Sequence, residues 1–318
     1  MSLSLNNLFD RITPRSKTVF GIGIGRDRLS VAHVVTTKQA RYIKRIKQIN
    51  LPFTLFSGAP TPEIGDALSS VLDELCCEVK RSHIPIQIAL PDPAVSLRVF
   101  DLDAIPKTSK EQLALAHWRF SKELHLGGRA IECSCQPIGV DNGKYLLLAM
   151  AVDRDWLLCL KEACRTAGVI STVIDMAACY RFNRFYGRFS CDGADMVVIS
   201  LDDDAWTVSI SDEQGRLRFV RSRWRETMPE RAKEYQEIAA ESERLVRIYT
   251  HSAPGRSIKN IHTIGNAQDI SGVADLLDKR MVGKCIRVAG GVEFMSTQGM
   301  SGNTVDSMVS TLSATILR

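Results

Sequence analysis

Glycines, carboxylates and a hydroxyl gather in three turns of the sequence, and these residue types could bind a charged ligand. The first turn includes Gly21-Ile22-Gly23-Ile24-Gly25 and reaches Asp27. The second is the acidic turn Asp202-Asp203-Asp204, with Thr207 soon after it, and the third is Gly265-Asn266. Glycine lets the backbone approach a ligand closely, and exposed backbone amides bind anions such as phosphate. The acidic turn opposes such binding, because three carboxylates repel an anion unless cations intervene.

The sequence lacks the other common catalytic and metal-binding patterns. Six histidines are scattered, and His33 and His117 are typical of packing or surface residues rather than of bases. No serine stands in a Gly-x-Ser-x-Gly elbow, and there is no Walker A motif. The nine cysteines fit no disulfide framework or zinc site, since Cys76-Cys77 and Cys133-Ser-Cys135 lack the C-x2-C spacing. We therefore expect reduced structural thiols, with metal binding as the alternative.

Length and composition are those of an ordinary globular protein with two lobes. The chain has 318 residues, of which 45% are hydrophobic and 24% are charged. No stretch approaches the roughly 20 apolar residues that cross a bilayer. Residues 1–16 are interrupted by Asn, Asp and Arg and lack the apolar core of a signal peptide. The sequence predicts a cytoplasmic protein with a flexible N-terminus.

Positive charge is concentrated near the start of the chain. Residues 1–50 contain ten Lys or Arg against two Asp, a balance of +8. Since the whole chain carries +5, the remaining residues carry −3. A basic N-terminal face would bind anionic lipid weakly or attract an acidic partner, and the alternative is an ordinary solvated surface. Nucleic acid is not expected, because aromatic residues do not interleave with the basic ones.

The elements that hold the three turns form two similar halves. Residues 18–24, 29–35 and 41–51 read as a three-strand meander, and 195–201, 205–211 and 216–223 repeat it. Helices and strands alternate after each meander, which indicates an α/β protein. An extra strand–helix–strand unit interrupts the first half. The predicted division is a first lobe at 17–190 with an insertion at about 96–140, and a second lobe at 191–318.

This layout resembles the actin, sugar-kinase and Hsp70 superfamily. Within it, the chain is similar to the PilM family of type IV pilus assembly proteins, including the MshI pilus-biogenesis proteins and the cytoplasmic part of the type II secretion L protein. The resemblance covers residues 19–318 and implies an actin-like (ribonuclease H-like) two-lobed fold. Besides the order of elements, four stretches carry it: 21–25, 97–102 at the start of the insertion, 112–124 with Trp118, and 265–267 after a strand.

The resemblance also implies a nucleotide site between the lobes, but this chain departs from the family's pattern. Gly23 stands where the first strand should supply a carboxylate for a Mg²⁺-bound water, and Asp27 lies beyond it. The second loop lacks a glycine, and Gly265 is equally typical of a plain strand-to-helix turn. We expect no cofactor, or ATP bound without turnover, and no catalytic residues. The degenerate site would consist of Gly21, Gly23, Gly25, Asp27, Asp202, Thr207, Gly265 and Asn266.

Family members lie beneath the inner membrane and hold the cytoplasmic tail of a single-span pilus protein, which they link to the motor ATPase. The resemblance therefore implies a scaffold peripheral to the membrane, with a peptide groove between the first lobe and its insertion. Residues expected to line the groove are Leu97, Val99, Trp118 and Phe120. The alternative is a nucleotide-binding ATPase or small-molecule kinase of the same superfamily. A membrane-tethered filament former is less consistent with the sequence, because the predicted last helix, 304–317, lacks a basic polar face.

Overall fold

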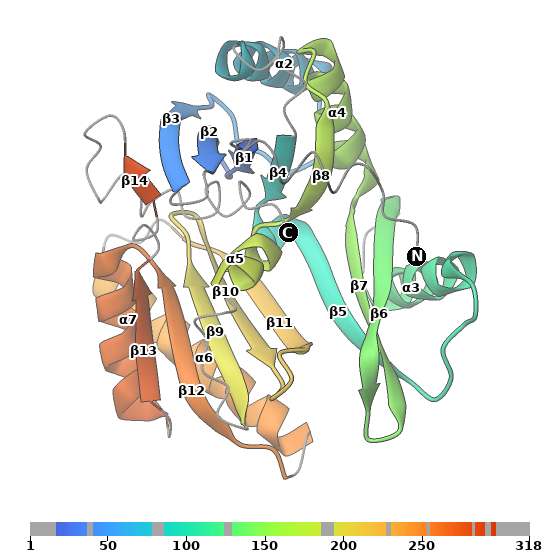
Figure 1. Cartoon of the computed structure of the whole chain (residues 1–318), viewed down its shortest axis with the longest axis vertical. Coiled ribbons are helices and arrows are strands. Elements are labelled where there is room, and N and C mark those ends of the chain that lie inside the picture. Colours follow the sequence, from blue (N-terminus) through green and yellow to red (C-terminus); the bar gives the residue numbers. More distant parts are fainter. Residues whose placement is uncertain are drawn as a thin grey trace, which may run out of the picture.

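The computed structural model describes residues 17–36, 41–77, 86–123, 129–185, 194–226, 230–252, 255–281, 284–289 and 294–296. They form two large sheets with helices packed on them and a third, smaller sheet beside the first (Figure 1). None of the described helices combines the length and apolar composition that a membrane span requires.

The first sheet has six strands in the order β14-β3-β2-β1-β4-β8. Strands β1 to β3 form the predicted antiparallel meander, while β4 and β8 continue the sheet in parallel. The strands are β1 (Lys17–Ile24), β2 (Arg28–Thr36), β3 (Arg41–Asn50), β4 (Ile86–Leu90), β8 (Ser171–Met176) and β14 (Phe294–Ser296). This arrangement places the β1–β2 turn at one end of the sheet.

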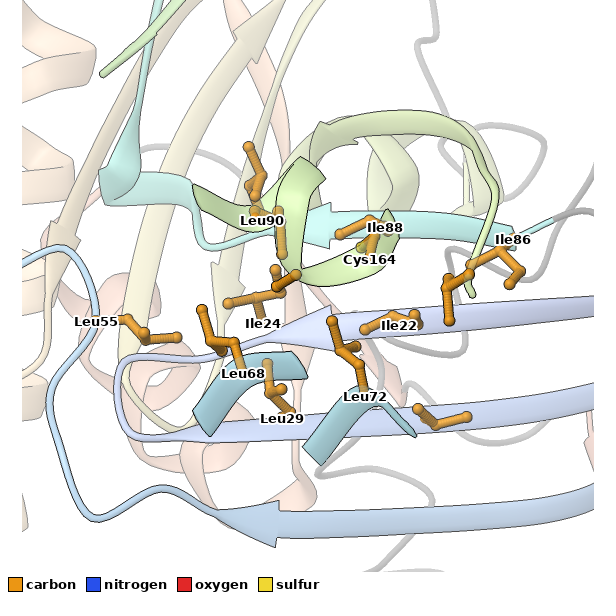
Figure 2. Close-up of a cluster of buried hydrophobic side chains, with 14 of the residues drawn as sticks. Ile22, Ile24, Leu29, Leu55, Leu68, Leu72, Ile86, Ile88, Leu90 and Cys164 are labelled. Atoms are coloured by element: carbon orange, nitrogen blue, oxygen red, sulfur yellow. The ribbon is translucent and has the colours of Figure 1, made fainter. Parts of the chain in front are cut away.

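Two helices, α2 (Pro62–Cys76) and α4 (Arg154–Thr166), pack on this sheet. Leu68 and Leu72, one helical turn apart on α2, lie against Ile22 and Leu29 of the meander (Figure 2). The side chain of Asp153 caps α4 by accepting hydrogen bonds from the amides of residues 155 and 156. The first core is therefore made by strands buried on their faces and by two amphipathic helices.

The second sheet has five strands in the order β11-β10-β9-β12-β13. It repeats the plan of the first sheet, since an antiparallel meander is followed by parallel strands on the side of its first strand. Its elements are β9 (Asp195–Leu201), β10 (Ala205–Ser211), β11 (Leu217–Trp224), β12 (Ile258–Gly265), β13 (Lys284–Ala289), α6 (Arg231–Ser252) and α7 (Ala267–Arg280). The duplicated layout predicted from the sequence is thus present.

Helix α5 (Ala177–Phe185) lies between the two large sheets (Figure 1). Tyr180 packs with Ala89 of the first sheet, while Phe182 packs against Met196 of the second. Because each face of α5 contacts a different lobe, this helix joins the lobes through apolar contacts as well as through the chain.

The insertion is larger than predicted. It is a separate three-stranded sheet in the order β5-β7-β6, with η1 (Asp92–Ala94) before it and α3 (Ser109–Glu123) against it. The strands are β5 (Val95–Leu102), β6 (Ile131–Asp141) and β7 (Lys144–Asp153). The prediction ended the insertion at residue 140, but β7 is its central strand. Asn142 and Gly143, both with positive φ (46° and 77°), turn β6 into β7 as a tight hairpin.

Three arginines fix the tip of this hairpin to the second lobe. Arg256 Nη2 donates to Asp141 at 2.6 Å, and Arg218 lies 3.4 Å from the same carboxylate. Arg216 Nη1 donates to the carbonyl of Val140 at 2.6 Å. The insertion therefore contacts both lobes, although it belongs to the first in sequence.

The predicted boundary of the second lobe, 191–318, also differs from the structure. Strand β14 pairs in parallel with β3, so the chain returns to the first sheet after β13. Three residues of strand carry too little pattern to be predicted from sequence. The predicted helix at 304–317 and the flexible segment 1–16 lie outside the described residues.

Candidate functional site

The β1–β2 turn and the β9–β10 turn, which come from different lobes, meet and bond to each other. The backbone amide of Arg26 donates to Asp204 Oδ2 at 2.5 Å. Arg28 Nη1 lies 3.2 Å from Asp203, and Arg28 Nη2 lies 3.8 Å from Asp204. Burial raises the pKa of both aspartates, and Arg28 opposes this shift in each case. Carboxylates of the second lobe thus lie against the amide and the guanidinium of the first.

Gly25 makes this close approach possible. A Cβ atom at Gly25 would lie 2.8 Å from Asp204 Oδ2 and 2.8 Å from Arg28 Cγ. Gly21 and Gly23 lie inside β1, where they pair with Ala32 and Ser30 of β2. Asp27 is exposed in the turn. Of the predicted first-turn residues, Gly25 alone has a described contact with the opposite lobe.

A buried polar cluster lies behind the two turns and also joins the lobes. Arg181 of α5, only 1% exposed, forms ion pairs with Asp92 of η1 and with Asp202. Asp92 also accepts hydrogen bonds from Thr207 Oγ1 at 2.5 Å and from the amide of residue 178 at 2.6 Å. Burial raises the pKa of Asp92, against the opposing effect of Arg181.

The structure places the predicted residues Asp202 and Thr207 in one cluster, but the two residues that link them, Arg181 and Asp92, were not predicted. Asp92 stands between two prolines, and the sequence reads there only as the end of a strand. Arg181 lies on a short helix and has no sequence signal that distinguishes it from a surface arginine. Neither residue could have been selected without the tertiary structure.

The third predicted turn is tightly packed by the protein itself. A Cβ atom at Gly265 would lie 2.6 Å from the carbonyl oxygen of Leu201. Asn266 caps α7, since its side chain accepts from the amide of Asp269 at 2.9 Å and donates to the Asp269 carboxylate at 2.8 Å. A Cβ atom at Gly272 would lie 2.4 Å from the ring of Tyr235. These glycines accommodate the protein's own groups.

Asp269 is the centre of a second buried network. Its carboxylate accepts hydrogen bonds from Arg225 at 2.7 Å, from Arg231 at 2.8 Å and from the Tyr235 hydroxyl at 2.6 Å. Burial by itself would raise the pKa of Asp269, but the hydrogen bonds from Arg225 and Tyr235 outweigh it and lower the pKa to about 2. The folded protein therefore favours the ionised carboxylate.

We expect this network to contribute to acid sensitivity. Because the folded-state pKa of Asp269 is lowered to about 2, its stabilising effect is present above its ordinary pKa of about 4 and is lost as the pH falls toward 2. Urea unfolding of wild type at several pH values should show this loss, and Asp269→Asn should show a shallower dependence. Asp278→Asn, on the exposed side of α7, is the matched control. Equal slopes in wild type and Asp269→Asn would contradict the assignment.

A cavity of about 750 Å³ lies between α4, β8 and the three-stranded sheet. Met150 and Val152 of β7, Val169, and Val173 of β8 give it an apolar lining. Polar and charged residues also line it, including Glu132 of β6 and Lys161 and Arg165 of α4. Ile170, 79% exposed, and Val173, 43% exposed, extend the apolar surface to the solvent. The cavity therefore lies between the first lobe and its insertion.

The four predicted partner-binding residues are not brought together, and none of them lines this cavity. Leu97 is buried in the first core, and Phe120, 0% exposed, packs edge-to-face on Phe100 within the insertion. Val99 is half-buried in β5. Trp118 is 49% exposed on the outer side of α3, with the Lys122 ammonium 4.2 Å from its ring centre.

Comparison with solved structures identifies the fold. A chain of the "PilM-PilN type IV pilus biogenesis complex" superposes with a TM-score of 0.69 over 93% of this chain and 97% of that chain, at 14% sequence identity. A Bacteroides thetaiotaomicron protein with an actin-like ATPase fold and unknown function gives 0.54 over 90% and 94%, at 10% identity. This chain has an actin-like fold. No family model matches it, and no curated protein matches its sequence.

The actin-like fold confirms the fold class that the resemblance implied. Its two lobes face each other through the β1–β2 and β9–β10 turns, which are the phosphate-binding turns that the resemblance implies. In this chain those turns bond to each other. At these sequence identities the similarity establishes the fold alone.

Proposed function

We propose that this actin-like protein is a scaffold of a type IV pilus, MSHA-type or type II secretion assembly that binds the cytoplasmic tail of a single-span inner-membrane partner. The observation that carries the proposal is the apolar cavity between the first lobe and the insertion. A solved structure with the same fold belongs to a PilM–PilN complex, which supports a role in pilus assembly. The protein would then lie in the cytoplasm, peripheral to the inner membrane.

The cavity borders the edge of a sheet, which suits an extended peptide. Strand β8 is the last strand of the six-stranded sheet. Four consecutive residues of β8, 173–176, line the cavity. Because successive side chains of a strand point to opposite faces, lining by consecutive residues means that the strand's edge borders the cavity. An extended tail laid along this edge would place alternate apolar side chains against Met150 and Val152.

The chemistry of the lining defines the kind of tail that fits. Its floor is apolar, so the buried side chains of the tail should be aliphatic or aromatic. The lining also has a cation, Lys161 on α4, and a carboxylate, Glu132 on β6. A tail with a carboxylate toward α4 and a basic side chain toward β6 would match both charges.

Exposed apolar residues allow a matched test of this site. Ile170→Asp and Val173→Asp should each weaken binding of the partner's cytoplasmic tail at least tenfold, because each puts a charge at the mouth of the cavity. Leu158→Asp is the control, since Leu158 is an exposed apolar residue of α4 (50% exposed) that does not line the cavity. Binding would be measured by fluorescence anisotropy with labelled peptides from the tails of the host's single-span pilus and secretion proteins.

Two results would contradict the proposed site. One is equal binding by the cavity variants and by Leu158→Asp. The other is loss of binding in Trp118→Ala alone, which would move the partner surface to the exposed side of α3. Failure of every host tail to bind wild type would overturn the scaffold function itself.

We also propose that the protein does not turn over ATP. The support is local: the amide of Arg26 and the guanidinium of Arg28 are engaged by carboxylates, and position 23 is a glycine inside β1. An ATPase or kinase, the alternative suggested by the fold, would need the amide and the guanidinium to bind phosphate. It would also need a carboxylate at position 23 for the metal. Either no cofactor or ATP without hydrolysis is consistent with this proposal.

Contacts with the motor ATPase and with anionic lipid remain predictions. Among the basic residues of β3, Lys44 is exposed, whereas Lys47 pairs with Glu74 of α2. A lysine already paired contributes less to lipid binding than the roughly 1 kcal/mol expected of one that reaches the headgroups. Any contribution of β3 to membrane binding is therefore weak and sensitive to salt.

A further inference from the structure

The acidic turn Asp202-Asp203-Asp204 has a function that phosphate binding does not explain. We propose that the β1–β2 and β9–β10 turns form an internal latch, in which Asp203 and Asp204 occupy the place of a bound phosphate and hold the lobes together without nucleotide. The latch is defined by the Arg26 amide and the Arg28 guanidinium on one side and by these two carboxylates on the other. It is independent of the cavity proposed for the partner.

The first turn already binds an anionic group, which is the carboxylate of Asp204 from the same chain. An amide in a glycine-rich turn is the donor that such a fold offers to a phosphate oxygen. Here the amide of Arg26 donates to Asp204 at 2.5 Å. The space that the absent side chain of Gly25 leaves open is filled by Asp204 and Arg28, each 2.8 Å from the Cβ position. A phosphate could reach this amide only by displacing the carboxylate.

Each carboxylate of the acidic turn has a cationic partner. Asp202 pairs with Arg181, while Asp203 and Asp204 both lie within ion-pair distance of Arg28. Three adjacent aspartates repel one another, so arginines on β2 and α5 are needed to hold the turn in place. Since both arginines belong to the part of the chain before the second lobe, the acidic turn serves as a contact between lobes.

The third predicted turn, Gly265-Asn266, and the helix after it are also packed by the protein's own side chains. Tyr235 of α6 packs against Gly272, and its hydroxyl donates to Asp269. Asn266 is used as the cap of α7. The residues of this chain therefore do not fit a nucleotide in the arrangement that the structure shows, at the β1–β2 turn or at the Gly265-Asn266 turn.

Hydrogen exchange of the full chain tests the latch directly. An amide at an exposed turn normally exchanges fast, so protection of the Arg26 amide in wild type would report its bond to Asp204. Asp204→Ala should speed exchange of the segment containing Arg26 at least tenfold. Asp27→Ala, in the same turn but exposed, should leave it unchanged. Calorimetry of wild type with Mg-ATP should detect no binding at millimolar nucleotide.

Two further changes keep the test decisive if one variant fails to fold. If Asp204→Ala does not fold, Arg28→Gln replaces it, because it removes the charge and leaves the buried cluster untouched. The exchanged pair Arg28→Asp with Asp203→Arg should be better protected than either single variant. Unchanged exchange in both Asp204→Ala and Arg28→Gln would overturn the latch. So would Mg-ATP binding to wild type that protects the Arg26 amide further. Neither outcome depends on whether a partner tail binds.

Discussion

Replacing Arg181 by methionine should lower the free energy of unfolding by about 3–5 kcal/mol, the cost of leaving one charge of a buried ion pair without its partner. Arg181 is 1% exposed and joins Asp92 of the first lobe to Asp202 of the second. Without the guanidinium, Asp92 keeps its hydrogen bonds from Thr207 and residue 178 but loses the opposing charge. Urea denaturation followed by circular dichroism would measure the loss.

Two further variants serve as controls for this measurement. Arg247→Met removes an exposed ion pair with Glu243 one helical turn away and should cost no more than about 0.5 kcal/mol. The double variant Asp92→Ala with Arg181→Met should be less destabilised than the sum of the two single variants, because neither member of the Asp92–Arg181 pair is left without the other. If Arg181→Met costs less than about 1 kcal/mol, the cluster does not join the lobes as described.

Replacing Phe120 by alanine should lower the free energy of unfolding by about 3–5 kcal/mol, the usual cost of truncating a buried aromatic residue. Phe120 is completely buried in the insertion and its ring contacts Phe100 at a centroid distance of 5.6 Å. The insertion has a small core of its own, so few neighbouring side chains are available to fill the space. Chemical denaturation of the full chain would measure this effect.

Trp118→Ala is the matched control, only two residues away on the same helix. Trp118 is half-exposed, and its described contacts are with the cationic ends of Arg119 and Lys122. Its loss should cost about 1 kcal/mol or less, the strength of exposed cation–π contacts. A destabilisation by Trp118→Ala equal to that of Phe120→Ala would show that α3 buries the opposite face. The pair thus separates a core residue from a surface one that sequence alone treated alike.

Sequence alone was sufficient for the two meanders, because their patterns are local. Strands such as Asp195–Leu201 are apolar runs bounded by turn residues, and the same pattern occurs twice along the chain. The alternation of helices and strands after each meander was predicted for the same reason, and the helix that packs Leu68 and Leu72 is the first helix of that alternation. Periodicity and turn residues are properties of neighbours in sequence, so these elements were placed within a few residues, and the resemblance ordered them into an actin-like fold.

The identity of the bonding partners depended on tertiary structure. The acidic turn suggested a phosphate site spoiled by repulsion, and nothing local indicated that Arg28, 175 residues earlier, would neutralise it. Arg181 and Asp92 meet across 89 positions of sequence. The prediction left β7 outside the insertion, whereas the structure places it at the centre of the insertion's sheet. The reason is that strand pairing is decided by which sheet edge a strand meets. Sequence determined which segments become strands, helices and turns; only folding decided which charges face each other, because Coulomb attraction and burial depend on distance in space.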